Sequence, residues 1–181
     1  MRLEAERSLV LIVDIQEKLA PAIVDSQQLL QAALWALEVA LQLKVPVFAT
    51  EQYPQGLGLT VPALRALLPD DAIFSKIHFS ALREPHIQQA IASQQRRQII
   101  VIGAESHVCV LQTALDLLSS GYQVFVVAAA VGSRNSNDKE LALSRLQQAG
   151  ASIVSLEMLA FEWLNKAGTT EFKKLLQGWI R

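Results

Sequence analysis

The amino-acid sequence predicts an α/β fold, namely a three-layer doubly wound parallel sheet of about six strands with helices on both faces. Short apolar runs alternate with longer amphipathic segments along the chain. The runs are continuously hydrophobic, which is typical of strands buried on both faces of a parallel sheet. Gly121 and Gly150 each stand between an amphipathic segment and the next apolar run, where a glycine commonly ends a helix.

Six apolar runs are expected to form the strands, and the third of them is short and weak. In chain order they are SLVLIVDI at 8–15, VPVFATE at 45–51, AIFSK at 72–76, QIIVIGAE at 98–105, YQVFVVAAA at 122–130 and ASIVSLE at 151–157.

Helices are expected between and after these runs. The segment NSND at 135–138 supplies N-cap residues for one of them. No repeat and no Pro/Gly-rich linker divides the chain, so residues 1–181 are expected to form a single domain. The expected helices cover 26–43, 60–68, 84–94, 108–120, 137–149, 157–165 and 169–179.

Composition argues against several classes of function. Hydrophobic residues make up 51% and charged residues 18% of the 181 residues, enough for a large core. The net charge of −1 provides no basic field for nucleic acid or anionic lipid, so neither is expected as a partner. The first apolar run is cut off by Asp14 and is too short for a signal peptide or a membrane span. A single cysteine and no Cys/His cluster of zinc spacing predict a cytoplasmic protein without a metal site.

Chemistry is expected where the strands end, because ligands of open α/β sheets bind beyond the carboxyl ends of the strands. The polar residues at or just past those ends are Asp14, Glu51, Lys76, Glu105 and Cys109. Each also has a simpler interpretation. Asp14 could cap the helix that follows, Lys76 could be a solvated surface charge, and Cys109 could be a small buried hydrophobe.

The position of Cys109 favours a chemical role. A thiol near a helix N-terminus lies close to unpaired amide groups, which favour the thiolate, and a neighbouring ammonium lowers its pKa further. The three strand ends then suggest a division of labour. Cys109 would be the nucleophile, Lys76 would hold the thiolate and keep Asp14 ionised, and Asp14 would be the general base.

Three segments resemble the isochorismatase-like cysteine hydrolases, whose members include nicotinamidases and N-carbamoyl amide hydrolases. They are LVLIVDIQ at 9–16, SKIHFSA at 75–81 and VIGAESHVCVLQTALDLLSSGYQVFVVAAAVGSR at 101–134. The resemblance covers nearly the whole chain and is greatest to the isochorismatase-domain-containing subgroup. It implies an isochorismatase-like, Rossmann-like fold and a catalytic triad of Asp14, Lys76 and Cys109.

The resemblance also implies an oxyanion hole made by the backbone amides of Glu105 and Cys109, aimed by a cis peptide bond at Ala104–Glu105. The region TEQYPQGLGLTVPAL lacks the histidine ligands of the nicotinamidase branch, so no metal is expected. Ser106 and His107 replace that branch's usual Thr-Asp or Thr-Glu pair, which argues against nicotinamide as substrate. The sequence leaves open whether Glu105 faces the pocket or pairs with a neighbour such as Arg134.

These observations predict a cysteine hydrolase of a small amide, carbamoyl or related acyl compound that needs no cofactor. The alternative is a catalytically silent binding or scaffold protein with the same fold. The predicted substrate-binding residues are Gln16, Glu51, Gln52, Tyr53, Leu57 and His107.

A homo-oligomer is also expected, because members of the family commonly oligomerise and the C-terminal segment is rich in large apolar residues. The open alternative is that these residues cover the domain's own sheet. They are Phe161, Trp163, Leu164, Phe172 and Trp179.

Overall fold

A computed structural model describes residues 1–178 and shows one six-stranded parallel sheet with the strand order β3-β2-β1-β4-β5-β6. All five strand pairings are parallel, as predicted. The strand order reverses between β1 and β4, and the carboxyl ends of these strands border the crevice where such sheets bind ligands. The strands are β1 (Ser8–Val13), β2 (Val47–Gln52), β3 (Ile73–Lys76), β4 (Gln98–Ala104), β5 (Gln123–Gly132) and β6 (Ser152–Val154).

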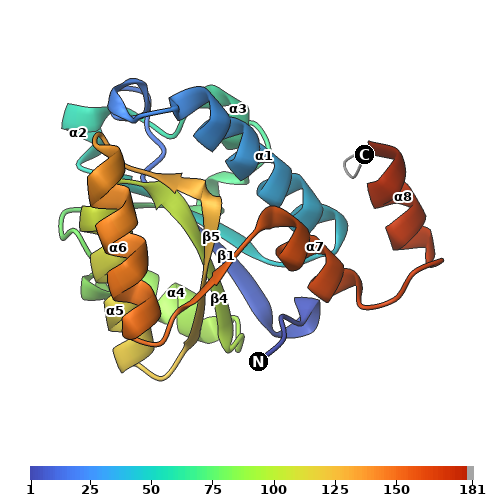
Figure 1. Ribbon diagram of the computed structural model, residues 1–181. Coiled ribbons are helices and arrows are strands. Elements are labelled where there is room, and N and C mark those ends of the chain that lie inside the picture. Colours follow the sequence, from blue (N-terminus) through green and yellow to red (C-terminus); the bar gives the residue numbers. More distant parts are fainter. Residues whose placement is uncertain (179–181) are drawn as a thin grey trace.

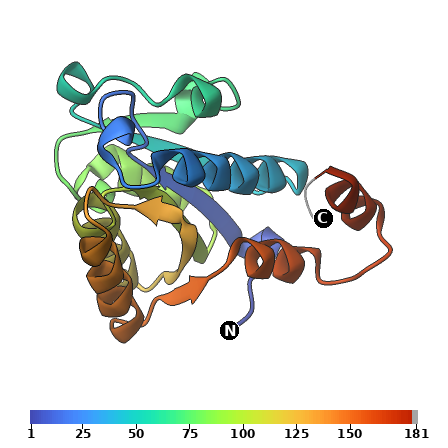
Figure 2. The ribbon, with the colours of Figure 1, turned by 45° about the horizontal axis from the view of Figure 1, so that its top comes forward.

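Helices cover both faces of the sheet and complete the predicted three layers (Figure 1). One apolar cluster joins α1, α3 and α7 to one face, and a second joins α4, α5 and α6 to the other. Figure 2 shows α1 lying along its face and α8 beyond α7, at the end of a long connection. The helices are α1 (Ser26–Gln42), α2 (Pro54–Leu57), α3 (Pro62–Arg65), α4 (Pro85–Ser93), α5 (Leu111–Ser119), α6 (Ser136–Gln148), α7 (Leu156–Leu164) and α8 (Thr170–Gly178).

Three elements differ from their predicted form. The helix expected at 60–68 is only the single turn α3, in a segment that contains Pro62 and Pro69. The helix expected at 108–120 starts earlier, with a π-helical turn, η5 (Ser106–Val110), that runs directly into α5. Strand β5 is longer than predicted because its pairing with β4 shifts register between Val101 and Gly103. An irregular register of this kind cannot be inferred from the apolar pattern, which continues unbroken through it.

The C-terminal aromatic residues divide between the core and the surface. Trp163 is buried and its indole Nε1 donates to Ser8 Oγ at 2.9 Å. Phe161 is 43% exposed, and its ring packs edge-on against that of Phe172, with 6.5 Å between the ring centroids. Trp179 lies outside the described residues. Part of this segment therefore covers the domain's own sheet.

Gly103 permits the closest approach of β1 and β4 near the crevice. It pairs with Val13 and has a φ of 150°. A Cβ atom at this position would lie 2.2 Å from the carbonyl oxygen of Val13, and a backbone atom cannot move aside without shifting the strand. Glycine is therefore required one residue before the end of β4, where the site begins.

We expect Gly103→Ala to lower the free energy of unfolding by about 3 kcal/mol through overpacking and backbone strain. Gly121→Ala is the matched control, since its Cβ would meet no atom within 4 Å and only the φ of 82° is unfavourable. That control should cost about 1 kcal/mol. Urea denaturation measures both, and equal losses would contradict the steric explanation.

Candidate active site

The centre of the site is an ion pair between Lys76 and Asp14. The Nζ atom of Lys76 lies 2.8 Å from Oδ2 of Asp14, and neither side chain has any exposed surface. Thr50 donates its hydroxyl to Oδ1 of the same carboxylate at 2.7 Å. Both charges are thus compensated inside the protein. The simpler interpretations of Asp14 as a helix cap and of Lys76 as a surface charge do not describe these positions.

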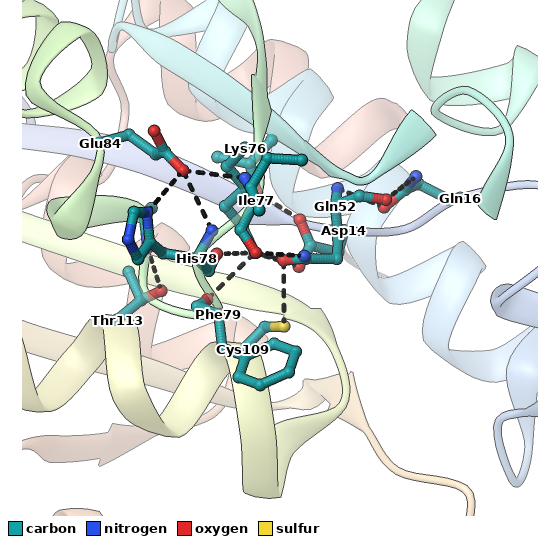
Figure 3. Close-up of polar contacts among 12 residues, drawn as sticks. Asp14, Gln16, Gln52, Lys76, Ile77, His78, Phe79, Glu84, Cys109 and Thr113 are labelled. Carbon is teal, nitrogen blue, oxygen red and sulfur yellow. Dashed lines mark hydrogen bonds and ion pairs between the residues drawn. The ribbon is translucent and has the colours of Figure 1, made fainter. Parts of the chain in front are cut away.

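The Lys76 ammonium has further acceptors around it. It donates to Oε1 of Gln52 at 2.6 Å and to the backbone carbonyl oxygens of Phe79 at 3.0 Å and His78 at 3.3 Å. Figure 3 shows these groups converging on the ammonium from β2 and from the loop that follows β3. An ammonium has three N–H bonds, so these oxygen atoms together with Asp14 offer an acceptor for each of them.

Cys109 lies beside this pair, on the first turn of the helix formed by η5 and α5. Its side chain is 4% exposed, and its thiol donates to Oε1 of Gln52 over a distance of 3.9 Å. The structure therefore brings together Asp14, Lys76 and Cys109, which the sequence placed on three separate strand ends (Figure 3).

The pKa of the Cys109 thiol differs from the sequence-based expectation. This pKa is raised to about 12, chiefly by burial and also by the charge of Asp14 and a hydrogen bond to its carboxylate, while Lys76 acts in the lowering direction. Burial outweighs the lysine because the thiol occupies an almost dry position. The resting thiol is protonated, and the expectation of a ready thiolate was wrong.

The two glutamines predicted to contact substrate both bond to the protein. Gln16 accepts the backbone N–H of Gln52 at 2.7 Å and donates to the carbonyl oxygens of Gln52 at 3.0 Å and Gly58 at 2.7 Å. Gln52 points to the ammonium and the thiol, and its Nε2 donates to the Ile77 carbonyl at 2.7 Å. Gln16 therefore joins β1 to β2, and Gln52 reaches the ammonium of Lys76 and the thiol of Cys109.

Glu51 points away from the ion pair, because neighbouring residues of a strand face opposite sides of the sheet. Its Oε1 accepts the Thr60 backbone N–H at 2.6 Å and pairs with Arg65 at 3.0 Å. In the loop that follows β2, Tyr53 is 53% exposed and Leu57 is half-buried. Both residues keep accessible surface.

Glu105 and His107 belong to a separate charged cluster. The buried carboxylate of Glu105 accepts two guanidinium hydrogen bonds from Arg134, each of 3.2 Å, which answers the question left open by the sequence. This contact raises the pKa of Arg134. His107 approaches Glu105 at 3.5 Å and contacts the Ser133 hydroxyl at 3.0 Å. Its side chain is 26% exposed.

Sequence reasoning missed Thr50, although one signal could have revealed it. Thr50 precedes Gln52 by two residues on β2, so both side chains face the same side of the sheet. A polar pair at that spacing near a strand end indicates a shared site. The carbonyl groups of His78 and Phe79 had no such signal, because backbone acceptors depend on the path of the loop and not on residue type.

Comparison with known proteins assigns the chain to a family. A family model described as the isochorismatase domain matches residues 8–158. The chain belongs to the isochorismatase family. The resemblance inferred from the three sequence segments is thereby confirmed, and membership in this family makes the chain a hydrolase.

Similar members of the isochorismatase family span most of this chain. It is 43% identical over 171 residues to isochorismatase domain-containing protein 2 of Bos taurus, covering 93% of this chain and 80% of that protein. A secreted isochorismatase effector of Phytophthora sojae is 37% identical, with 96% and 85% covered.

Solved structures agree with this membership. One described as the MAR1 ribonuclease of Caenorhabditis elegans superposes with a TM-score of 0.91 at 34% identity, covering 98% of this chain and 91% of that one. The YcaC product of Escherichia coli, described as an octameric hydrolase of unknown specificity, has a TM-score of 0.88 at 27% identity, with 92% and 83% covered.

One family feature expected here is absent. No cis peptide bond occurs within residues 1–178, so the expected cis bond at Ala104–Glu105 was wrong. Glu105 instead has a φ of 58°, and this left-handed conformation turns the chain from β4 into the helix that carries Cys109.

Over the described part of the chain, no group of three or more His, Cys, Asp or Glu side chains could hold a metal ion. None of the helices in residues 1–178 has both the length and the apolar character needed to cross a membrane.

Alkylation of Cys109 by iodoacetamide should reveal the two opposing charges beside it. We expect the rate to rise with pH through the neutral range without a plateau below about pH 10, because the thiol is the protonated form. Asp14→Asn should be faster at a given pH, since the carboxylate raises the pKa of the thiol. Lys76→Met should be slower, since the ammonium lowers it.

Cys109 is the single cysteine, so the reagent reports on it alone. Glu157→Gln, an exposed change in the first turn of α7, is the control and should match the unmodified chain. A plateau near the ordinary thiol pKa, or the same direction in both site variants, would contradict this account.

Proposed function

We propose that this chain is a cysteine hydrolase that acts on a small amide, carbamoyl compound or related acyl substrate, with Asp14, Lys76 and Cys109 as its catalytic triad. The observation that carries the proposal is the fully buried ion pair between Lys76 and Asp14 beside the single thiol of the chain. A buried, paired carboxylate next to a protonated thiol is the arrangement of a general base and its nucleophile.

Acylation would begin with transfer of the thiol proton. Asp14 takes the proton from Sγ of Cys109 while the sulfur attacks the substrate carbonyl carbon, and the carbonyl electron pair moves onto oxygen. The backbone N–H groups of Glu105 and Cys109 would bind that oxyanion. When the tetrahedral species collapses, the C–N bond breaks, the leaving nitrogen takes the proton from Asp14, and a thioester on Cys109 remains.

Deacylation would use the same groups. Asp14 takes a proton from a water molecule whose oxygen attacks the thioester carbon, and the departing sulfur takes that proton back. Lys76 would hold the Asp14 carboxylate in place at 2.8 Å and balance its charge in the buried site. A protonated resting thiol suits this scheme, because the proton moves only when substrate is present.

The six predicted substrate-binding residues would divide into two groups. Tyr53, Leu57 and His107 keep accessible surface, and we assign them to substrate contact. Gln16, Glu51 and Gln52 use their polar atoms on protein partners, and we assign them to supporting the site. No cofactor enters the scheme.

We propose further that residues 1–181 act as one domain in a cytoplasmic homo-oligomer. The octameric state of the E. coli YcaC product supports self-association. Met158 and Phe161 of α7 are 47% and 43% exposed and offer apolar surface for it. The P. sojae relative is described as secreted, so location differs within the family.

Ribonuclease activity, named for the C. elegans neighbour, is not carried over to this chain. Binding of RNA relies on lysine and arginine contacts to phosphate, and the net charge here is −1. A catalytically silent binding protein is a second candidate, favoured by a thiol that is 4% exposed with a pKa of about 12.

An activated acyl donor separates these candidates. We expect p-nitrophenyl acetate to give a burst of p-nitrophenol and an acetyl group on Cys109, identified by peptide mass spectrometry. Asp14→Asn should slow the burst by about a hundredfold through loss of the general base, and Cys109→Ala should abolish it. An acetyl group elsewhere, or a burst that persists in Cys109→Ala, would refute the hydrolase proposal and favour the binding protein.

A further inference from the structure

Glu84 lies outside the triad, and its carboxylate binds the chain immediately after Lys76. Its Oε1 accepts the backbone N–H of Ile77 at 2.8 Å and of His78 at 3.0 Å, and also contacts the His78 ring at 3.0 Å (Figure 3). Glu84 precedes α4, but its side chain makes no capping bond to that helix. The carboxylate therefore serves the loop and not the helix.

The same stretch of backbone is held from the opposite side by the site. Gln52 donates to the carbonyl oxygen of Ile77, and the Lys76 ammonium donates to those of His78 and Phe79. A peptide unit whose N–H is fixed by Glu84 has a fixed carbonyl direction as well, because the unit is planar. The N–H of His78 and the carbonyl of Ile77 belong to one peptide unit, so the carboxylate fixes the acceptor that the Gln52 amide uses. Gln52 in turn presents its Oε1 to the ammonium.

The loop is also attached to the helix that carries the nucleophile. The backbone N–H of Ala81 donates to the Thr113 hydroxyl at 3.0 Å, and Arg83 pairs with Asp116 at 2.8 Å. Thr113 and Asp116 both lie on α5. The segment 77–84 consequently connects Lys76 to the helix that carries Cys109. Glu84, at the end of this segment, binds the backbone N–H groups of its first two residues.

The charge of Glu84 persists over the working range of pH. The two backbone N–H groups and the His78 ring lower the pKa of this carboxyl group to about 2. A carboxylate accepts hydrogen bonds more strongly than a neutral oxygen does. At neutral pH, Glu84 is therefore ionised, and it binds the N–H groups of Ile77 and His78 as a carboxylate.

We propose that Glu84 is a positioning residue: by holding the N–H groups of Ile77 and His78, it fixes the Ile77 carbonyl that orients the Gln52 amide, and so keeps the Gln52 oxygen on the Lys76 ammonium beside Asp14 and Cys109. Only the consequence for Cys109 chemistry rests on the proposed function. The geometry of Lys76 can be tested without it.

The decisive measurement is exchange of the Lys76 ammonium protons with water, followed by NMR on the full chain with ¹⁵N-labelled lysine. A buried ammonium with four oxygen acceptors should exchange slowly. Glu84→Ala should accelerate exchange about tenfold, because Gln52, an acceptor of the ammonium, loses the fixed carbonyl that orients its amide. Glu84→Gln keeps an oxygen acceptor without the charge and should accelerate it by a smaller factor of about three.

Two controls separate positioning from general destabilisation. Ile91→Val trims a buried side chain of α4 and lowers stability without touching residues 77–79. Glu157→Ala removes an exposed carboxylate on α7. Both should leave the exchange of the Lys76 ammonium unchanged.

Unchanged exchange in Glu84→Ala, or acceleration of equal size in Ile91→Val, would overturn the proposal. If Glu84→Ala does not fold, Glu84→Gln decides: faster exchange supports positioning, and wild-type exchange refutes it. In the same samples, Glu84→Ala should lower the alkylation rate of Cys109, the direction expected for Lys76→Met. Absence of an acetyl-enzyme would refute the hydrolase while leaving the ammonium result standing.

Discussion

A buried ion pair spanning three strands is the interaction on which the rest of this structure depends. Asp14 follows β1 and Lys76 ends β3, and β2 lies between them in the sheet. The parallel registers pair Thr50 of β2 with Val13 of β1, and Gln52 of β2 with Lys76 of β3. Thr50 therefore lies beside Asp14 and binds it, and Gln52 lies beside Lys76 and binds it. Either charge alone would cost several kcal/mol to bury, so the pair and its hydrogen-bond partners form together.

The ion pair also acts on the Cys109 thiol. Asp14 and Lys76 act in opposite directions on the pKa of the Cys109 thiol, and burial decides the outcome. A site of this kind differs from one with a preformed thiolate and imidazolium, because its resting state carries no charge on sulfur. In the proposed mechanism the proton would move within this one cluster, from Cys109 to Asp14 and on to the leaving group.

Polar side chains at the strand ends mostly hold the loops that surround the site. Gln16 binds the end of β2 and Gly58, Glu51 binds Thr60 and Arg65, and Glu84 binds the chain after Lys76. Such contacts fix the backbone around a reaction centre, which allows the reacting groups to stay in place without substrate. This explains why residues that stand next to catalytic positions in sequence need not touch the substrate.

The arrangement of α and β elements and the identity of the three central residues were readable from the sequence. Continuous apolar runs report strands buried on both faces, and parallel strands bring the residues that follow them to one edge. Asp14, Lys76 and Cys109 were found for that reason, and the match to the isochorismatase domain confirms the fold that was inferred.

Tertiary structure alone decided the details that depend on burial and on direction. The raised pKa of Cys109 reflects how completely neighbours exclude water, and one sequence does not contain that quantity. Whether Glu105 faced the pocket or Arg134 depended on the turn after β4, where the peptide bond is trans. The carbonyl groups that hold Lys76 belong to the backbone, and their directions follow the path of the loop after β3, which also contacts Thr113. Residue types thus determined which groups are present, and packing determined what each of them contacts.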